Sequence, residues 1–237
     1  DPAYFYIAPN FTPGNEWRNI TGGQLIDAHT GGISYLNGKY YWYGESYNNS
    51  TPEVELGGIV AYSSNDLLNW KYEGFMIASS SVKYTRPRVI YNAASSTYVM
   101  WARNATIGRA MVATSSNPYG PFRVYNTRLD ISGFGNNDLD LFVDDNGTGY
   151  VAHASSDTTR IVVAQLSSDY LSPQGSFVNV AALANRAAPV MFRHGDVYYL
   201  MTASTSATFA HTLAKYSTSS SPLGTYSYPV NPFQSSG

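Results

Sequence analysis

The chain has 237 residues, of which 43% are hydrophobic and only 13% are charged, and its net charge is −2. This composition is too apolar for a disordered chain, and the charge lacks the excess of basic residues that nucleic acids or anionic membranes attract. No apolar run approaches the roughly 20 residues of a membrane-spanning helix. The chain begins at Asp1 without a signal-like segment, which is typical of a mature or processed form. We therefore expect a single folded domain over residues 1–237.

Six Asn-X-Ser/Thr sequences occur in this cysteine-free chain. They begin at Asn10, Asn19, Asn48, Asn49, Asn104 and Asn146. Each one alone is a weak signal, because Asn, Ser and Thr are common in turns. Their number in a Ser/Thr-rich, Lys-poor sequence predicts a secreted, N-glycosylated protein.

A hairpin-like segment recurs four times, at about residues 33–44, 89–101, 141–152 and 190–201. Each copy joins an apolar segment to an aromatic-rich one through a turn of Asn, Asp, Ser or Gly residues, which is typical of β-hairpins. Two further short β-type segments follow each hairpin. The pattern predicts four repeats of four antiparallel strands, at about 22–78, 79–128, 129–180 and 181–237, after an N-terminal segment 1–21. A period of roughly 50 residues without helical periodicity predicts an all-β propeller.

Polar residues open the first strand of every repeat. They lie at Asp27–His29, Thr85–Arg86, Asn137–Asp140 and Asn185–Ala187. In a propeller this strand lines the central channel, where a polar side chain needs a partner or a ligand. We therefore expect Asp27, Arg86, Asp138 and Ala187 to converge on one pocket. Plain strand-entry turns are the alternative, since Asp and Pro are common there.

These segments resemble motifs of glycoside hydrolase family 43, and within it the exo-β-1,3-galactanase-like branch. In the first repeat, Ala28–Gly32 corresponds to the family's Ala-His-Gly-Gly-Gly, and Tyr40–Glu45 to its Tyr-Tyr-Trp-Tyr-Gly-Glu. In the later repeats, Thr85–Arg88 corresponds to Glu-Arg-Pro-Lys, Asn137–Asp138 to Arg-Asp, and Arg186–Pro189 to Arg-Glu-Ala-Pro. The resemblance extends from about Trp17 to Phe233. It implies a five-bladed propeller, of which the chain shows four blades, and a galactose-containing oligo- or polysaccharide as partner.

Two departures from the family pattern bear on catalysis. The Glu of Arg-Glu-Ala-Pro is the family's general acid, and this chain has Ala187 there, which cannot donate a proton. The Glu before Arg-Pro, a sugar-contacting residue in the family, is Thr85 here. In the galactanase branch a Gln from a later segment is implicated in place of the usual base, and we do not expect this chain to reach that segment.

Binding residues survive at other positions. The resemblance implies that Asp138 matches the aspartate that orients the acid, and that His29, Glu45 and Arg86 contact sugar. Asp27 is a further carboxylate near the channel. Trp42 and Trp101 are candidates for stacking on a pyranose ring, with packing in the core as the equal alternative.

Asp140 has no counterpart in the family and is a candidate substitute acid. Asp138 and Asp140 are two residues apart, so that on one strand they point to the same side. Such a pair can share a proton or bind a structural cation. No other metal or cofactor is expected, because the four His residues are scattered along the sequence.

Three functions remain open. The first is a sugar-binding propeller whose catalysis is lost or crippled. The second is an active, inverting, exo-acting hydrolase that uses a substitute acid. The third is a structural or defence protein without a sugar ligand.

Overall fold

The computed structural model describes residues 16–47, 56–78, 81–205 and 213–232. Its strands form four antiparallel sheets, each built from consecutive strands. The first contains β1 (His29–Leu36), β2 (Lys39–Tyr47), β3 (Leu56–Ser64) and β4 (Lys71–Ile77), and the second contains β5 (Tyr84–Asn92), β6 (Thr97–Asn104), β7 (Arg109–Ser115) and β8 (Arg123–Leu129). The third contains β9 (Leu139–Val143), β10 (Gly149–Ala154), β11 (Ile161–Leu166) and β12 (Pro173–Asn179), and the fourth contains β13 (Arg186–His194), β14 (Val197–Ser204) and β15 (Lys215–Ser219).

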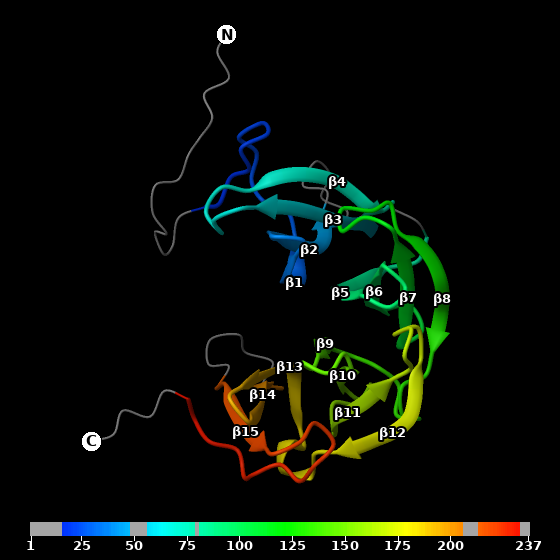
Figure 1. Ribbon diagram of the computed structural model, residues 1–237, viewed down its shortest axis with the longest axis vertical. Coiled ribbons are helices and arrows are strands. Elements are labelled where there is room, and N and C mark those ends of the chain that lie inside the picture. The colour runs from blue at the N-terminus through cyan, green and yellow to red at the C-terminus, as the bar shows by residue number, and fades with distance from the viewer. Residues whose placement is uncertain (1–15, 48–55, 79–80, 206–212, 233–237) are drawn as a thin grey trace, which may run out of the picture.

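The four sheets follow one another around an arc, with β1, β5, β9 and β13 toward its centre (Figure 1). This arrangement confirms the predicted all-β propeller, and we call the sheets blades 1 to 4 in chain order. The one helix in the described residues is the 3₁₀ turn η1 (Ala181–Leu183). None of the described helices is long and apolar enough to cross a bilayer.

Local sequence explains the hairpins. β1 and β2 are joined by Asn37 and Gly38, whose φ angles are 49° and 76°. Two successive left-handed residues define the type I′ turn, and its twist matches that of the paired strands. The register pairs Leu36 with Lys39 and Ser34 with Tyr41, so that the aromatic side chains of β2 alternate between the two faces of blade 1.

Three apolar clusters hold neighbouring blades together. Tyr43 and Met100 are fully buried between blades 1 and 2, Trp101 and Val151 between blades 2 and 3, and Ile161 and Leu200 between blades 3 and 4. Since each blade is a thin sheet, this face-to-face burial supplies the core that one blade lacks.

In blade 4 the predicted fourth strand corresponds to the segment that follows β15. It lies beside β15 and pairs with it through an isolated bridge between Tyr216 and Val230 and a 2.8 Å hydrogen bond from the Ser227 N–H to the carbonyl oxygen of Thr218, rather than through a regular ladder. The Tyr226 side chain is nevertheless buried among the blade 3 and blade 4 residues, as the aromatic pattern suggested.

The two end blades expose apolar side chains on their outer faces. On blade 1, Ile33 and Tyr35 are 48% and 64% exposed, and their register partners Trp42 and Tyr40 lie on the side opposite to blade 2. On blade 4, Val190 and Phe192 are 43% and 39% exposed. Among the described residues no fifth sheet covers these faces.

His153 is a fully buried histidine on β10. Its Nδ1 lies 3.2 Å from the carbonyl oxygen of Ala154, and its Nε2 lies 2.9 Å from the hydroxyl of Ser132. A neutral ring that donates from Nδ1 and accepts at Nε2 satisfies both contacts. Burial lowers the pKa of His153 from 6.5 to about 4, against the smaller opposing effects of the Ala154 carbonyl and the charge of Asp130.

We expect the free energy of unfolding to fall by about 2 kcal/mol between pH 8 and pH 5, because the unfolded chain takes up a proton at His153 before the folded chain does. The loss begins near pH 6.5 and is complete near pH 4, the two pKa values of this residue. Urea unfolding across this range measures it. His153→Gln should flatten the profile, whereas His194→Gln, at an exposed histidine, should leave it unchanged. A His153→Gln protein with the wild-type slope would contradict this assignment.

Candidate functional site

A β-bulge interrupts the same end of three inner strands. The bulges lie between His29 and Gly32 in β1, between Thr85 and Arg88 in β5, and between Ala187 and Val190 in β13. Each contains a non-glycine residue with left-handed backbone: Thr30 at φ 53°, Arg86 at 55° and Ala188 at 49°. Such residues are uncommon and gather at functional sites, where a bulge re-aims side chains.

Glycine is required in the first bulge. A Cβ atom on Gly31 would lie 1.7 Å from the carbonyl oxygen of Tyr43, and one on Gly32 would lie 3.0 Å from the guanidinium of Arg88. The two glycines therefore let β1 approach β2 closely and let Arg88 reach across from blade 2. This explains the Gly-Gly sequence that follows Thr30.

An ion pair lies at the centre of the arc. Arg86 pairs with Asp138 through its Nε, and Oδ2 of Asp138 accepts a hydrogen bond of 2.8 Å from the backbone N–H of Ala188. Blades 2, 3 and 4 therefore meet at Asp138, whose side chain is 10% exposed. The structure brings together Arg86, Asp138 and the Ala187–Ala188 segment, as the sequence predicts.

A second ion pair lies beside the first. Arg88 donates from Nε to Oδ1 of Asp140 at 2.8 Å, and the N–H of Met191 donates to Oδ2 of Asp140 at 3.0 Å. Each carboxylate faces an arginine of its own, an arrangement that disfavours the sharing of a proton or a cation between Asp138 and Asp140. Both oxygens of Asp140 meet protein donors, an arrangement that suits an acceptor rather than a general acid.

Glu45 lies at the end of β2 and is 3% exposed. Its Oε1 accepts hydrogen bonds from the hydroxyls of Thr30 at 2.7 Å and Tyr47 at 2.8 Å, whereas its buried Oε2 has no partner. Burial and the bond to Glu45 raise the pKa of Tyr47 to about 12, so that this phenol remains a donor at neutral pH. The free oxygen of Glu45 is an acceptor that a ligand hydroxyl would satisfy.

Asp27 and His29 form a neighbouring group. His29 Nε2 lies 2.9 Å from Oδ1 of Asp27, and Asp27 also accepts from the Tyr47 N–H at 3.0 Å and the Ser46 hydroxyl at 2.6 Å. The His29 ring packs on Tyr47 at 4.3 Å between centroids. These residues lie next to Glu45, and within the described residues no hydrogen bond or ion pair joins them to Asp138.

Two arginines near the bulges have no carboxylate partner within 4 Å among the described residues. Arg103, partly buried on β6 and opposite Thr85 in the register, donates only to the carbonyl oxygen of Asn136 at 3.3 Å. Arg186 donates to the hydroxyl of Thr202 and to two carbonyl oxygens. Burial lowers the pKa of Arg103, and the nearby charge of Arg86 lowers it further, against the smaller opposing effects of the Asp138 and Glu45 carboxylates.

The sequence did not single out Arg88, Arg103, Thr30 or Tyr47. Arg88 was visible as the second basic residue of Arg-Pro-Arg, and Thr30 as the residue that replaces the first Gly of Ala-His-Gly-Gly-Gly. Nothing in the sequence marked Arg103, because its relation to Thr85 depends on the register of β5 and β6.

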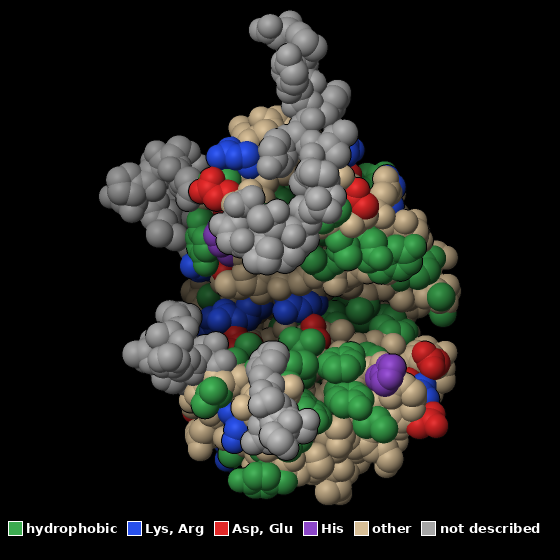
Figure 2. Space-filling model, turned by 90° about the vertical axis from the view of Figure 1, so that its left-hand side faces the viewer, with side chains coloured by type: hydrophobic (Ala, Val, Ile, Leu, Met, Phe, Trp, Pro, Cys, Tyr) green, Lys and Arg blue, Asp and Glu red, His purple; other side chains and the backbone are tan. Residues whose placement is uncertain are grey.

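The enclosed space at this site is small. A hollow of about 70 Å³ is lined by Thr30, Arg86, Arg88, Asp138, Leu139, Ala188, Pro189 and Val190. Enclosed ligand pockets usually measure about 300–1,000 Å³, so this hollow alone is too small for a ligand, which would need the open groove above it. Figure 2 shows such a groove on the open side of the arc, with basic and acidic side chains gathered along it.

The two candidate stacking residues are packed by protein. Trp101 is fully buried between blades 2 and 3, and its indole N–H donates to the carbonyl oxygen of Tyr170 at 2.8 Å. Trp42 packs edge-on against Trp17 at 5.5 Å and Trp70 at 5.4 Å on the outer face of blade 1. The sugar-stacking prediction is therefore wrong for Trp101, and the packing alternative describes Trp42.

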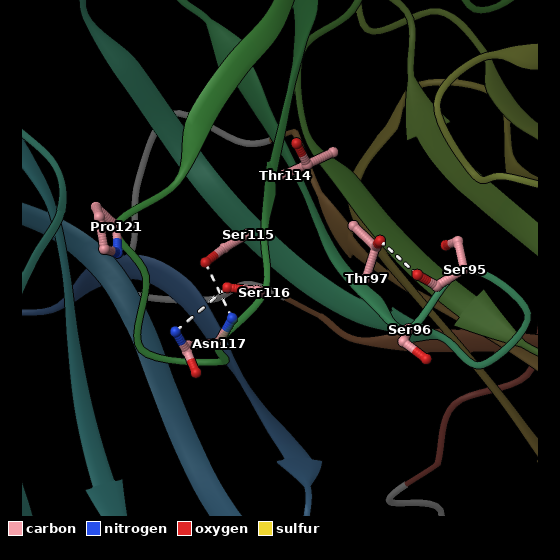
Figure 3. A pocket seen from close by; sticks show the side chains of 8 residues that line it. All are labelled: Ser95, Ser96, Thr97, Thr114, Ser115, Ser116, Asn117 and Pro121. Atoms are coloured by element: carbon pink, nitrogen blue, oxygen red, sulfur yellow. Dashed lines mark hydrogen bonds between the residues drawn. The ribbon is translucent and has the colours of Figure 1, made fainter.

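A larger cavity of about 540 Å³ lies away from these groups, at the turns of blade 2 (Figure 3). Its lining residues are Ser95, Ser96, Thr97, Thr114, Ser115, Ser116, Asn117 and Pro121. They bond mainly to one another: the Asn117 N–H donates to Ser115 Oγ at 3.1 Å, for example. The lining contains no charged and no aromatic side chain, so we place the candidate site at the bulges instead.

The predicted glycosylation sites differ in access. Asn146 is exposed in the β9–β10 turn. The side chains of Asn19 and Asn104 are buried, and their Nδ2 atoms donate to the carbonyl oxygens of Gln24 and Thr127. A glycan on Nδ2 needs solvent, so the prediction is wrong for these two in the folded chain. Asn10, Asn48 and Asn49 lie outside the described residues.

No cluster of three or more His, Asp or Glu side chains with metal-binding geometry occurs in the described part of the chain. Asp144 and Asp145 form ion pairs with Arg193 at 3.3 and 2.7 Å. This turn joins blades 3 and 4 through an ion pair.

Several solved structures with this fold are named as β-1,3-galactosidases or exo-β-1,3-galactanases. A family 43 β-1,3-galactosidase with galactodeoxynojirimycin superimposes with a TM-score of 0.84 and 30% identity, over 92% of this chain and 80% of that chain. An exo-β-1,3-galactanase from Clostridium thermocellum gives 0.82 and 28%, over 93% of this chain and 51% of that chain. A variant exo-β-1,3-galactanase from Phanerochaete chrysosporium with β-1,3-galactotriose gives 0.81 and 28%, over 92% and 53%.

The chain therefore spans about half the length of the two galactanases. No curated protein matched its sequence. The family model for glycosyl hydrolases family 43 matches residues 27–236, which include every bulge and ion pair described above. By this match and by the 30% identity to the β-1,3-galactosidase, the chain belongs to glycosyl hydrolases family 43.

Proposed function

We propose that the chain is a secreted protein that binds β-linked galactosides and whose hydrolytic activity is lost or crippled. One observation carries the proposal: Arg86, Asp138 and Glu45 surround the bulges, while the neighbouring position 187 is an alanine. The charged groups that hold sugar hydroxyls are present, and the side chain that protonates a leaving oxygen is not.

The remaining carboxylates favour binding over catalysis. An inverting hydrolase needs an acid and a base on opposite faces of the scissile bond. Asp138 forms an ion pair with Arg86 and accepts from the Ala188 N–H, and Asp140 accepts from Arg88 and from the Met191 N–H. Of these three carboxylates, only Glu45 keeps an oxygen with neither an ion pair nor a hydrogen bond, so no two of them combine a free acid with a free base.

A structural neighbour supports sugar binding without a full set of glutamates. The Phanerochaete chrysosporium exo-β-1,3-galactanase has been solved with β-1,3-galactotriose after a single Glu-to-Ala substitution. The exposed sequon at Asn146 supports the extracellular location.

Galactose and short β-1,3-galactan fragments are expected to bind with Kd values of about 1 μM to 1 mM, because an open groove makes few buried contacts. Glu45→Gln should weaken binding about tenfold, since it removes a charged acceptor for sugar hydroxyls. Glu73→Gln on the outer strand β4 is the matched control and should leave the Kd unchanged. Isothermal titration calorimetry measures the Kd values of the unchanged chain and of the two variants. A folded protein that gives no heat at millimolar sugar would contradict this proposal and favour a structural or defence protein without a sugar ligand.

A further inference from the structure

We infer that the preferred ligand of this site carries a carboxylate, as a hexuronic acid unit of an acidic galactan does, and that Arg103 binds it. The inference rests on the proposed function, because it names the class of sugar that the same site takes. Three features of the described residues support it, and each concerns charge rather than shape.

The first feature is the unpaired guanidinium of Arg103. This side chain is partly buried, and among the described residues its one hydrogen bond goes to a neutral carbonyl oxygen at 3.3 Å. A charge that leaves water is stabilised only by a counter-ion and good hydrogen bonds. The described residues place no carboxylate within 4 Å of Arg103, so its remaining N–H groups are available to an anion from outside.

The second feature is the residue across the ladder. Thr85 of β5 pairs directly with Arg103 of β6, and directly opposed side chains on a sheet face are neighbours. Thr85 is buried and ends in a short neutral hydroxyl, which accepts a long contact of 3.4 Å from Arg86. A carboxylate at this position would neutralise Arg103. Because the chain does not supply one, a carboxylate on the ligand fits the same place.

The third feature is the balance of charge around the groove. Arg86 and Arg88 each form an ion pair with an aspartate, whereas Arg103 and Arg186 form no ion pair within the described residues. Asp27 faces His29, Ser46 and the Tyr47 N–H rather than these arginines. Figure 2 shows basic side chains gathered along the groove, with acidic side chains beside them. A groove of this kind attracts an anion over a neutral sugar.

The test compares methyl β-galactopyranoside with methyl β-galactopyranosiduronate, which differ only in the oxidation of C6. Calorimetry at pH 7 and 50 mM NaCl should give a Kd at least about tenfold lower for the uronide, since a guanidinium–carboxylate bond is roughly twice as strong as a neutral one. Raising NaCl to 500 mM should shrink this ratio, because salt screens the charge pair. Equal affinities, or tighter binding of the neutral sugar, would overturn the inference while leaving galactoside binding intact.

Two variants assign the effect to Arg103. Arg103→Gln should bring the ratio of the two Kd values close to one, and Arg123→Gln, on the exposed outer strand β8, should preserve it. Thr85→Glu should also abolish the preference, because the protein then supplies the carboxylate itself. This variant decides the question if Arg103→Gln does not fold. A preference for the uronide that survives both changes contradicts the role of Arg103, and a failure of both sugars to bind contradicts the proposed function as well.

Discussion

Hydrolysis of β-1,3-galactan by this protein is expected to be at least about 10²–10⁴-fold slower than by an enzyme with an intact general acid, because proton transfer to the leaving group contributes about that much. The bulge in β13 puts Ala187 next to the residue whose N–H binds Asp138, and alanine has no proton to give. Galactose release from reduced β-1,3-galactan, followed over hours, measures the residual rate.

Restoring the acid tests the same point from the other side. Ala187→Glu should raise the residual rate, whereas Ala184→Glu, at an exposed position three residues earlier, should not. Rapid turnover by the unmodified chain would contradict this prediction. If Asp140→Asn then abolished that turnover, Asp140 would be the substitute acid despite its contacts with Arg88 and Met191.

Trp101→Ala is expected to lower the free energy of unfolding by about 3–5 kcal/mol, the usual cost of removing a buried tryptophan from a packed core. The indole fills the interface of blades 2 and 3 and binds the carbonyl oxygen of Tyr170. Trp101→Phe keeps most of the apolar contact and loses the N–H donor, so it should cost about 1–3 kcal/mol. Urea unfolding of the three proteins measures both values.

The same variants separate packing from recognition. Galactoside binding by folded Trp101→Phe protein should match that of the unchanged chain, because the indole has no exposed surface. A stable variant that had lost sugar binding would show that Trp101 stacks on the sugar, and would contradict its assignment to the packed core.

The sequence predicted the blades because their determinants are local. A left-handed Asn-Gly turn and the alternation of aromatic residues are fixed by neighbours a few positions away. The aromatic pattern of Tyr226 and Tyr228 predicted the fourth segment of blade 4, and of these two side chains only that of Tyr226 is buried.

The partners of the site residues depend on pairs that are far apart in the chain. Arg88 and Asp140 are 52 residues apart, and Asp138 binds a backbone N–H 50 residues away. Alternation correctly put Asp138 and Asp140 on one side, but it carried no information about the arginines that meet them. The glycosylation prediction failed at Asn19 and Asn104 because a three-residue pattern carries no information about burial.

The three bulges also explain how the chemistry of this fold can change while the fold persists. A bulge inserts one residue into the ladder, so that the strand beyond it keeps its own alternation and its own buried face. Thr85 and Ala187 lie at the outer edge of their bulges, and Val89 and Met191 lie on the core side. Exchanging Thr85 or Ala187 therefore leaves the register of the strand beyond the bulge unchanged. Such positions evolve almost independently of folding, which gives a lineage room to abandon one reaction and acquire a different ligand.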